Sequence, residues 1–175
     1  MQEEFYRSYD SFALLADVRN GTGLGGCDTG DGFVPISKPK GLPKGRRSGS
    51  FGDHSFSWLT LKEMKEYDWN RVTKHRGYVS EKQYLELRES GNPPSCYSGA
   101  VMGGTLIKLT DKEYDELEKT NKLPKNKTIE VQMEWEVPYK EAGWVYSRLI
   151  PELDRIAKEY SVTDDHVRFV FGFDS

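Results

Sequence analysis

Glycine is concentrated in one stretch of this 175-residue chain. Ten of its 17 glycines, with three of its eight prolines, lie between Gly21 and Gly52. Because both residue types favour turns over helices and strands, residues 19–57 are predicted to form one long irregular loop. Loops of this length in a small domain are generally functional or disordered. We interpret this one as a partly ordered ligand-binding loop, so the regular elements must come from the rest of the chain.

Helix signals precede and follow this loop. Residues 9–18 place Phe12, Leu15 and Ala16 at helical spacing, which predicts a short helix. Pairs of a hydroxyl residue and a glutamate or glutamine three positions later form capping boxes, which predict three further helix starts. These pairs are Thr60 with Glu63, Ser80 with Gln83, and Thr110 with Glu113.

Strand signals dominate the second half of the chain. Residues 128–137 alternate apolar and polar side chains, which predicts a half-buried strand whose outer face carries Glu130, Glu134 and Glu136. Residues 104–109 and 167–173 are predicted strands by their β-branched and aromatic content. Residues 71–79 fit a strand or an extended link, and residues 139–160 a helix in which Pro151 introduces a kink or starts a second segment.

We therefore expect one α+β domain over residues 1–175. It combines the helix at 9–18, the long Gly/Pro-rich N-terminal loop at 19–57, and several short amphipathic helices within residues 58–175. These helices accompany a three-strand core, which forms a small antiparallel or mixed sheet in the C-terminal half.

Composition restricts the classes of function. The chain has 25 Lys and Arg against 28 Asp and Glu, a formal charge of −3, which argues against a general duplex-DNA binder. Neither a membrane-spanning apolar run nor a signal peptide is recognisable, so we expect an intracellular protein that does not enter membranes. Cys27 and Cys96 are expected to be free thiols. The three histidines lack metal-ligand spacing, and we expect no metal or other cofactor.

The first candidate for chemistry is the run Arg19-Asn20-Gly21-Thr22-Gly23-Leu24-Gly25-Gly26. Glycine lets backbone amides approach an anion closely, as in the amide nests that hold phosphates. The run follows a predicted helix and lacks a closing Gly-Lys-Ser/Thr, so it is neither a dinucleotide fingerprint nor a P-loop. A tight turn after a helix is the structural alternative, and it explains Gly21 without a ligand.

The second candidate is a basic stretch from Ser37 to Phe51, which contains five basic residues and no acidic one. These residues are Lys38, Lys40, Lys44, Arg46 and Arg47. Such a local positive loop suits a phosphate-bearing ligand, and the adjacent arginines favour bidentate phosphate contacts. The alternative is a solvated basic loop without a ligand.

The third candidate is the segment from Gly52 to Thr60. Phe56 or Trp58 offers a ring on which a base can stack, while His54 and Ser55 can hydrogen-bond a base edge or a phosphate. A structural tryptophan at a helix start is the alternative for Trp58. Asp, His and Ser occur together here, but a catalytic triad requires a proximity in space that sequence spacing does not establish.

Several segments also carry a resemblance to a known family. They are YDSFALLADVRNGTGLGG, DGFVPISKPKGLP, DHSFSWLTLKEMKEYDW, VPYKEAGW and VRFVFGFD. Together they resemble a widespread family of small phage and prophage proteins, over most of the chain after residue 8. Many relatives begin with a Met-Gly-Cys-Asp-Ile-His segment and an extra strand that this chain lacks. If that segment forms part of the relatives' pocket, the ligand of this chain differs.

The resemblance implies a viral sponge that sequesters cyclic di- or trinucleotide signals of bacterial CBASS defence. Such sponges are homo-oligomers, here a dimer or tetramer, that bind without cleaving and act in the cytoplasm of the infected bacterium. The residues themselves agree in one respect, since amides, cations and aromatic rings follow one another from Arg19 to Trp58. The expected ligand contacts are Arg19, Asn20, Gly25, Gly26, Arg46, Arg47, His54, Ser55 and Trp58.

Two other classes of function stay open. A phosphodiesterase-type hydrolase would use His54 as general base, oriented by Asp53 or Asp28. A protein-interaction inhibitor would instead dock the basic stretch on an acidic surface of a host protein. We expect a binding protein without catalytic residues, because no general acid, nucleophile or metal site is convincing in the sequence.

Overall fold

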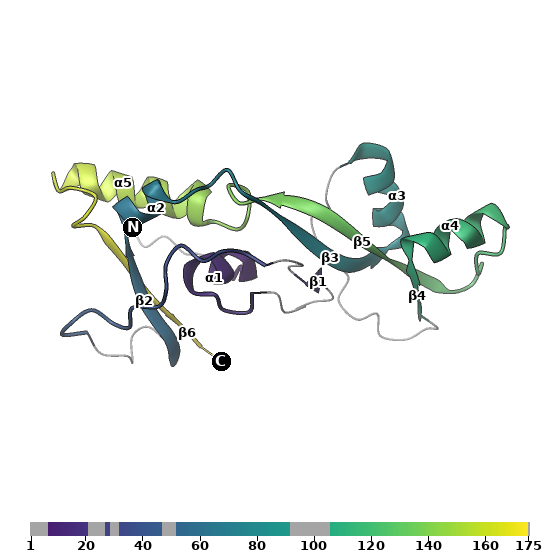
Figure 1. Ribbon diagram of the computed structural model, residues 1–175, viewed down its shortest axis with the longest axis horizontal. Coiled ribbons are helices and arrows are strands. Elements are labelled where there is room, and N and C mark those ends of the chain that lie inside the picture. The colour runs from purple at the N-terminus through teal and green to yellow at the C-terminus, as the bar shows by residue number, and fades with distance from the viewer. Residues whose placement is uncertain (1–6, 21–26, 29–31, 47–51, 92–105, 175) are drawn as a thin grey trace. The chain divides into compact units, whose positions relative to one another are not determined.

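The computed structural model describes residues 7–20, 27–28, 32–46, 52–91 and 106–174 (Figure 1). It contains helices and two small sheets, which confirms the α+β class. Contacts divide the chain into two compact units, although the sequence suggested one domain. Unit 1 comprises the chain up to Asn20, Phe33–Val72 and the chain from Pro138, and unit 2 comprises Gly21–Gly32 and Thr73–Val137. Each unit is described by itself.

Unit 1 combines a two-stranded antiparallel sheet with helices. The sheet pairs β2 (His54–Thr60) with β6 (Arg168–Phe173). The helices are α1 (Tyr9–Ala16), α2 (Leu61–Glu66), the π-helix η2 (Val145–Leu149) and α5 (Ile150–Glu159). The expected loop at 19–57 is therefore too long at its C-terminal end, because pairing with β6 makes residues from His54 onward a strand.

Unit 2 is built on a mixed sheet with the strand order β1-β3-β5-β4. Its strands are β1 (Cys27–Asp28), β3 (Val72–Ser80), β4 (Leu106–Thr110) and β5 (Thr128–Pro138). The parallel pair β4 and β5 is connected through α4 (Asp111–Lys119), whereas α3 (Glu81–Ser90) follows β3. The side chain of His75 contacts Trp135 and that of Arg76 contacts Glu134, which is the register of antiparallel neighbours.

The three-strand core predicted for the C-terminal half is wrong in one strand. The β4 and β5 strands share a sheet as expected, but β6 pairs with β2 in unit 1. For residues 71–79 the sequence allowed either a strand or an extended link, and the structure has the strand β3 there. Strand partners are chosen by tertiary contacts between distant segments, so the local pattern of residues 167–173 identified the strand without its partner.

All three predicted capping boxes are present. Thr60, Ser80 and Thr110 each accept a hydrogen bond from the backbone three residues later, and the side chain at that position bonds back. The first helix ends at Ala16 rather than at residue 18, because Asp17 adopts a left-handed backbone with φ of 58°. In the region 139–160, regular helix begins only at Val145, and Pro151 lies in the first turn of α5.

The acidic face of β5 is only partly exposed. Glu134 and Glu136 are exposed as expected, whereas Glu130 is buried, with 4% of its surface accessible. The strand lies between β3 and β4, and Lys108 of β4 is opposite Glu130, with its Nζ 3.9 Å from the Glu130 carboxylate. A cation on the neighbouring strand β4 is thus paired with a carboxylate that alternation alone assigned to solvent.

Two buried tyrosines link α3 and α4 in unit 2. Tyr84 and Tyr114 pack edge to face with ring centroids 4.9 Å apart, Tyr84 donates to Asp111, and Tyr114 donates to Glu81 over 2.8 Å. Burial, reinforced by the hydrogen bond to Asp111, raises the pKa of Tyr84 from 10 to about 12. Burial and the bond to Glu81 also raise the pKa of Tyr114.

These tyrosines predict alkaline destabilisation. Between pH 10 and about 12, Tyr84 stays protonated in the folded protein but ionises in the unfolded chain. The stabilisation is therefore complete below pH 10 and is lost as the pH rises through that window. We expect Tyr84→Phe to flatten the fall in unfolding free energy, measured by urea denaturation at pH 8 to 11. An equally steep fall in this variant would contradict the assignment.

Candidate functional site

A cavity of about 320 Å³ lies in unit 1, between α1, the two-stranded sheet and Trp144. Its volume falls at the lower end of the range of about 300–1,000 Å³ that is usual for small-molecule sites. Aromatic side chains are the largest group among its lining residues. The aromatic lining residues are Tyr9, Phe12, Trp144, Phe169, Phe171 and Phe173.

The β6 strand supplies one aromatic wall. Phe169, Phe171 and Phe173 occupy alternate positions, so their side chains share one face of the strand. The rings of Phe169 and Phe171 stack 5.4 Å apart, and Phe12 of α1 packs edge-on against Phe173 at 4.8 Å. Phe12 and Phe169 are only half-buried, which leaves ring surface for a planar ligand group.

A β-bulge brings His54 into the cavity. His54 pairs with Phe173 and Ser57 with Phe171, so β2 has one more residue between these pairs than β6 has. In a strand without a bulge, residues three positions apart, such as His54 and Ser57, would lie on opposite faces. The bulge contains Ser55 with φ of 52°, and its Oγ lies 2.9 Å from Nδ1 of His54. Ser55 therefore acts on the site by orienting His54.

Arg19 supplies positive charge at the cavity. It follows α1 with φ of 56°, a backbone conformation that is uncommon outside glycine. Its guanidinium lies over the ring of Tyr9, 5.1 Å from the centroid, and Nη1 donates to the Tyr9 hydroxyl over 3.0 Å. Arg7 also lines the cavity, and Asp174 is the acidic residue among its lining. Two guanidinium groups against one carboxylate give the lining a net positive charge that favours an anionic ligand.

The other predicted contacts that the structure describes are not among the residues lining this cavity. Asn20 holds the backbone of Phe33, donating to its carbonyl over 2.6 Å and accepting from its amide over 2.7 Å. Arg46 is exposed and does not line the cavity as described. Gly25, Gly26 and Arg47 lie outside the described residues. Of the nine predicted contacts, the structure thus brings Arg19 and His54 together in one cavity, with Ser55 beside His54.

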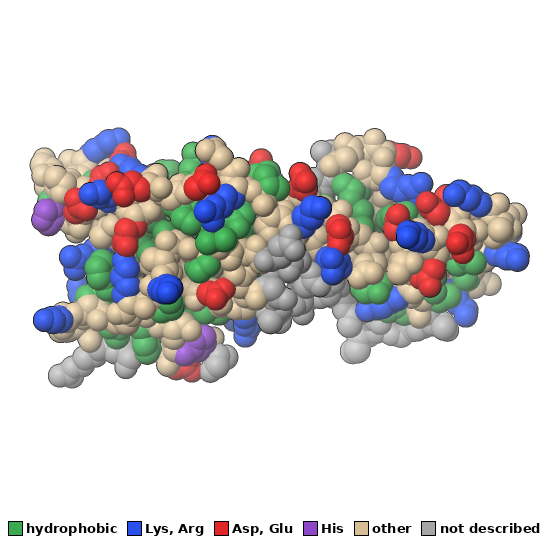
Figure 2. Space-filling view, in the orientation of Figure 1, with side chains coloured by type: hydrophobic (Ala, Val, Ile, Leu, Met, Phe, Trp, Pro, Cys, Tyr) green, Lys and Arg blue, Asp and Glu red, His purple; other side chains and the backbone are tan. Residues whose placement is uncertain are grey.

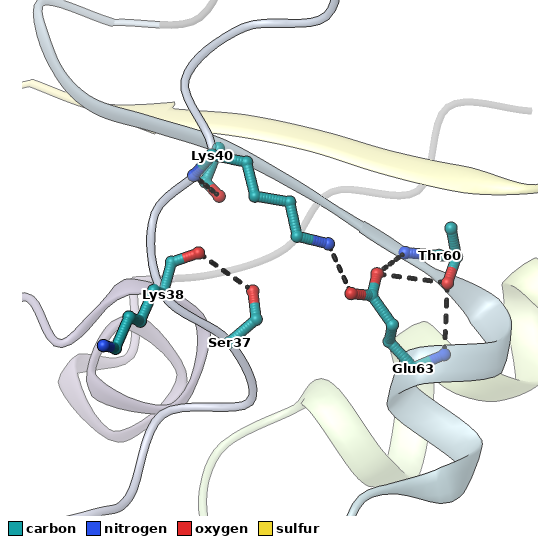
Figure 3. A network of polar contacts seen from close by, with 6 residues as sticks. Ser37, Lys38, Lys40, Thr60 and Glu63 are labelled. Atoms are coloured by element: carbon teal, nitrogen blue, oxygen red, sulfur yellow. Dashed lines mark hydrogen bonds and ion pairs between the residues drawn. The ribbon is translucent and has the colours of Figure 1, made fainter.

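The described part of the basic stretch is anchored to the start of α2. Figure 3 shows the Lys40 side chain reaching Glu63, the residue that also completes the capping box with Thr60. The Lys40 amide in turn donates to Ser57 Oγ of β2 over 3.1 Å. Contact with Lys40 and with Thr60 lowers the pKa of Glu63 although partial burial opposes this shift. Lys40 is thus an anchor of the loop and not a countercharge in the cavity.

Trp58 lies on the opposite face of β2 from the cavity. It pairs with Val170, while Leu59 pairs with the cavity residue Phe169, and successive strand residues point to opposite faces. Two cations lie over the Trp58 ring: Nζ of Lys40 is 4.2 Å from the ring centre, and Cζ of Arg168 is 4.6 Å from it. Trp58 therefore belongs to a separate surface and does not stack on a ligand in the cavity.

Sequence reasoning missed most of the cavity wall. The alternating aromatics of residues 167–173 were interpreted as core, although a wall of a cavity has the same pattern. Arg7 and Asp174 belong to no recognisable sequence motif. They line the cavity because the first and last described segments of the chain both fold against it.

These features describe an α+β protein with a cavity that is lined by aromatic rings and carries a net positive charge. Comparison of the chain with protein-family models, curated proteins and solved structures found no match. Among the described residues, no group of three or more His, Cys, Asp or Glu side chains could hold a metal ion. Within the same residues, every helix is too short or too polar to cross a membrane.

Proposed function

We propose that this protein binds and sequesters a cyclic di- or trinucleotide signal without cleaving it. The observation that carries the proposal is the meeting of Arg19 and His54 in a cavity with aromatic walls. A nucleotide requires a ring surface for its base and cations or N–H donors for its phosphate. The cavity offers both within one small space.

The size of the cavity fits part of such a ligand. At about 320 Å³ it is suited to one nucleotide unit of a cyclic oligonucleotide. A homo-oligomer would supply a second cavity for the next unit, in line with the dimer or tetramer that the sequence resemblance implies. In this role the protein would act in the cytoplasm of an infected bacterium, as a phage protein that lowers the concentration of a CBASS signal.

The surroundings of His54 favour binding over hydrolysis. Its Nδ1 is engaged with Ser55, and its Nε2 lies 3.8 Å from Asp53, beyond hydrogen-bond distance. Asp53 is largely exposed and does not hold His54 as the orienting group of a base would, whereas the side chain of Asp28 is outside the described residues.

Mass spectrometry of released ligands tests the proposal. The purified protein is incubated with a panel of cyclic di- and trinucleotides, freed of unbound material and denatured. We expect at least one nucleotide to be recovered intact in stoichiometric amount. Recovery of a linear product that His54→Ala abolishes would establish hydrolysis instead. Retention of no nucleotide, together with a stoichiometric host protein in pull-downs, would favour the protein-interaction inhibitor.

A further inference from the structure

The outer face of the β2–β6 sheet carries a cluster that the cavity does not use. Phe56 and Trp58 lie two residues apart on this face of β2, and Val170 is opposite Trp58 on β6. Arg168, opposite Thr60, and Lys40 place their cationic groups over the Trp58 ring. We call these five residues the basic aromatic face: Lys40, Phe56, Trp58, Arg168 and Val170.

The face is accessible to a partner. Phe56, Trp58 and Val170 are half-buried and Arg168 is exposed. The other three tryptophans, Trp69, Trp135 and Trp144, are each 4–6% exposed, so Trp58 is the one tryptophan that a partner can readily reach. In Figure 2, Lys and Arg side chains gather beside hydrophobic ones over β2 and the loop before it.

Charge around the face is predominantly positive. Lys38, Lys44 and Arg46 are exposed on the loop that carries Lys40, and the described part of that loop, residues 37–46, contains no acidic residue. The carboxylate of Glu63 neutralises the charge of Lys40, but the pair also fixes the loop. The Lys40 ammonium pairs with Glu63, and the Lys40 amide donates to Ser57 Oγ. Lys40 is therefore held near the aromatic surface before any ligand arrives, which reduces the entropy lost on binding.

We infer that the basic aromatic face binds single-stranded nucleic acid. A base that stacks on Trp58 would displace the Lys40 or Arg168 cation that lies over its ring. The displaced cation would then pair with the phosphate backbone, and Phe56 lies two residues away on the same face for a second base. An acidic peptide would use the cations but would leave the aromatic rings without stacking partners. A duplex keeps its bases stacked on one another and presents no free base surface to the rings. The face lies on the other side of the sheet from the cavity, so the inference does not depend on the proposed cyclic nucleotide.

Tryptophan fluorescence gives a direct test with a ten-residue oligothymidylate. Titration of the intact protein should quench Trp58, and Trp58→Phe should remove the quench while retaining binding in fluorescence anisotropy. Trp58→Ala should weaken binding about tenfold through lost stacking. Arg168→Gln should weaken binding and reduce the slope of log affinity against log salt by about 0.7, as expected for one lost phosphate contact.

Arg155→Gln is the matched control for Arg168→Gln. It makes the same change of charge on α5, where Arg155 pairs with Glu152 and Glu159, and it should leave the affinity and the salt slope unchanged. The inference is overturned if the oligonucleotide does not bind, if Arg155→Gln and Arg168→Gln weaken binding equally, or if a ten-residue polyglutamate or a ten-base-pair duplex binds more tightly. Circular dichroism identifies any variant that fails to fold. If Trp58→Ala fails to fold, Trp58→Phe still tests the site, because it keeps an aromatic ring at this position.

Discussion

Alanine at Gly143 is expected to destabilise unit 1 by about 2–4 kcal/mol, the sum of left-handed backbone strain and overpacking. Gly143 has φ of 64°, and a Cβ there would lie 2.1 Å from Ser11 Oγ and 2.7 Å from Ser8 Oγ. Both hydroxyls are in use, since Ser8 caps α1 and Ser11 accepts a hydrogen bond from the Trp144 amide over 3.0 Å. The added methyl group must therefore displace α1 or break these bonds.

Gly41→Ala is the control for this experiment. Gly41 has a similar φ of 73°, but among the described residues other than its chain neighbours no atom lies within 4 Å of a Cβ built there. Its substitution should cost only the backbone strain, about 1–2 kcal/mol. Chemical denaturation followed by circular dichroism measures both losses. Equal destabilisation by the two substitutions would show that crowding against α1 contributes nothing.

Removal of the Arg19 side chain is expected to give the largest loss of ligand affinity. If the guanidinium makes a charge-assisted bond to a phosphate, Arg19→Ala should weaken binding by about 1.5–3 kcal/mol. Calorimetry with the nucleotide selected by the mass spectrometry panel measures this loss. Arg19→Lys should recover part of the affinity, because a lysine keeps the charge but not the planar fork of donors.

Arg46→Ala separates the cavity from the basic stretch. Arg46 is exposed and outside the described cavity lining, so its removal should leave nucleotide affinity unchanged. Unchanged affinity in Arg19→Ala would remove Arg19 from the site. A loss in Arg46→Ala as large as in Arg19→Ala would return the ligand to the loop that the sequence first indicated.

Features determined by neighbouring residues were predictable from the sequence. The three capping boxes depend on residues three positions apart, and each marks a helix start in the structure. Alternation identified β5 for the same reason. The partner of β6 was not predictable, because a strand of alternating aromatics fits either sheet until tertiary contacts select one.

The polar residues of the site could be predicted from the sequence where they belong to recognisable motifs. Arg19 and His54 were identified, and both line the cavity. Lys40 was identified as a countercharge, yet Glu63 engages it, because an acidic residue 23 positions later folds back against the loop. The aromatic wall was missed, since burial in a core and exposure to a cavity produce the same sequence pattern.

The bulge at Ser55 allows the chain between His54 and Ser57 to vary in length without moving His54 to the other face of β2. Deletion of Ser55 would leave a regular two-residue spacing between His54 and Ser57, opposite Phe173 and Phe171, so both side chains would stay on the cavity face. The deletion would instead remove the hydroxyl that lies beside Nδ1 of His54. Along this part of the chain, related sequences that keep the same face for His54 are therefore expected both with and without the extra residue.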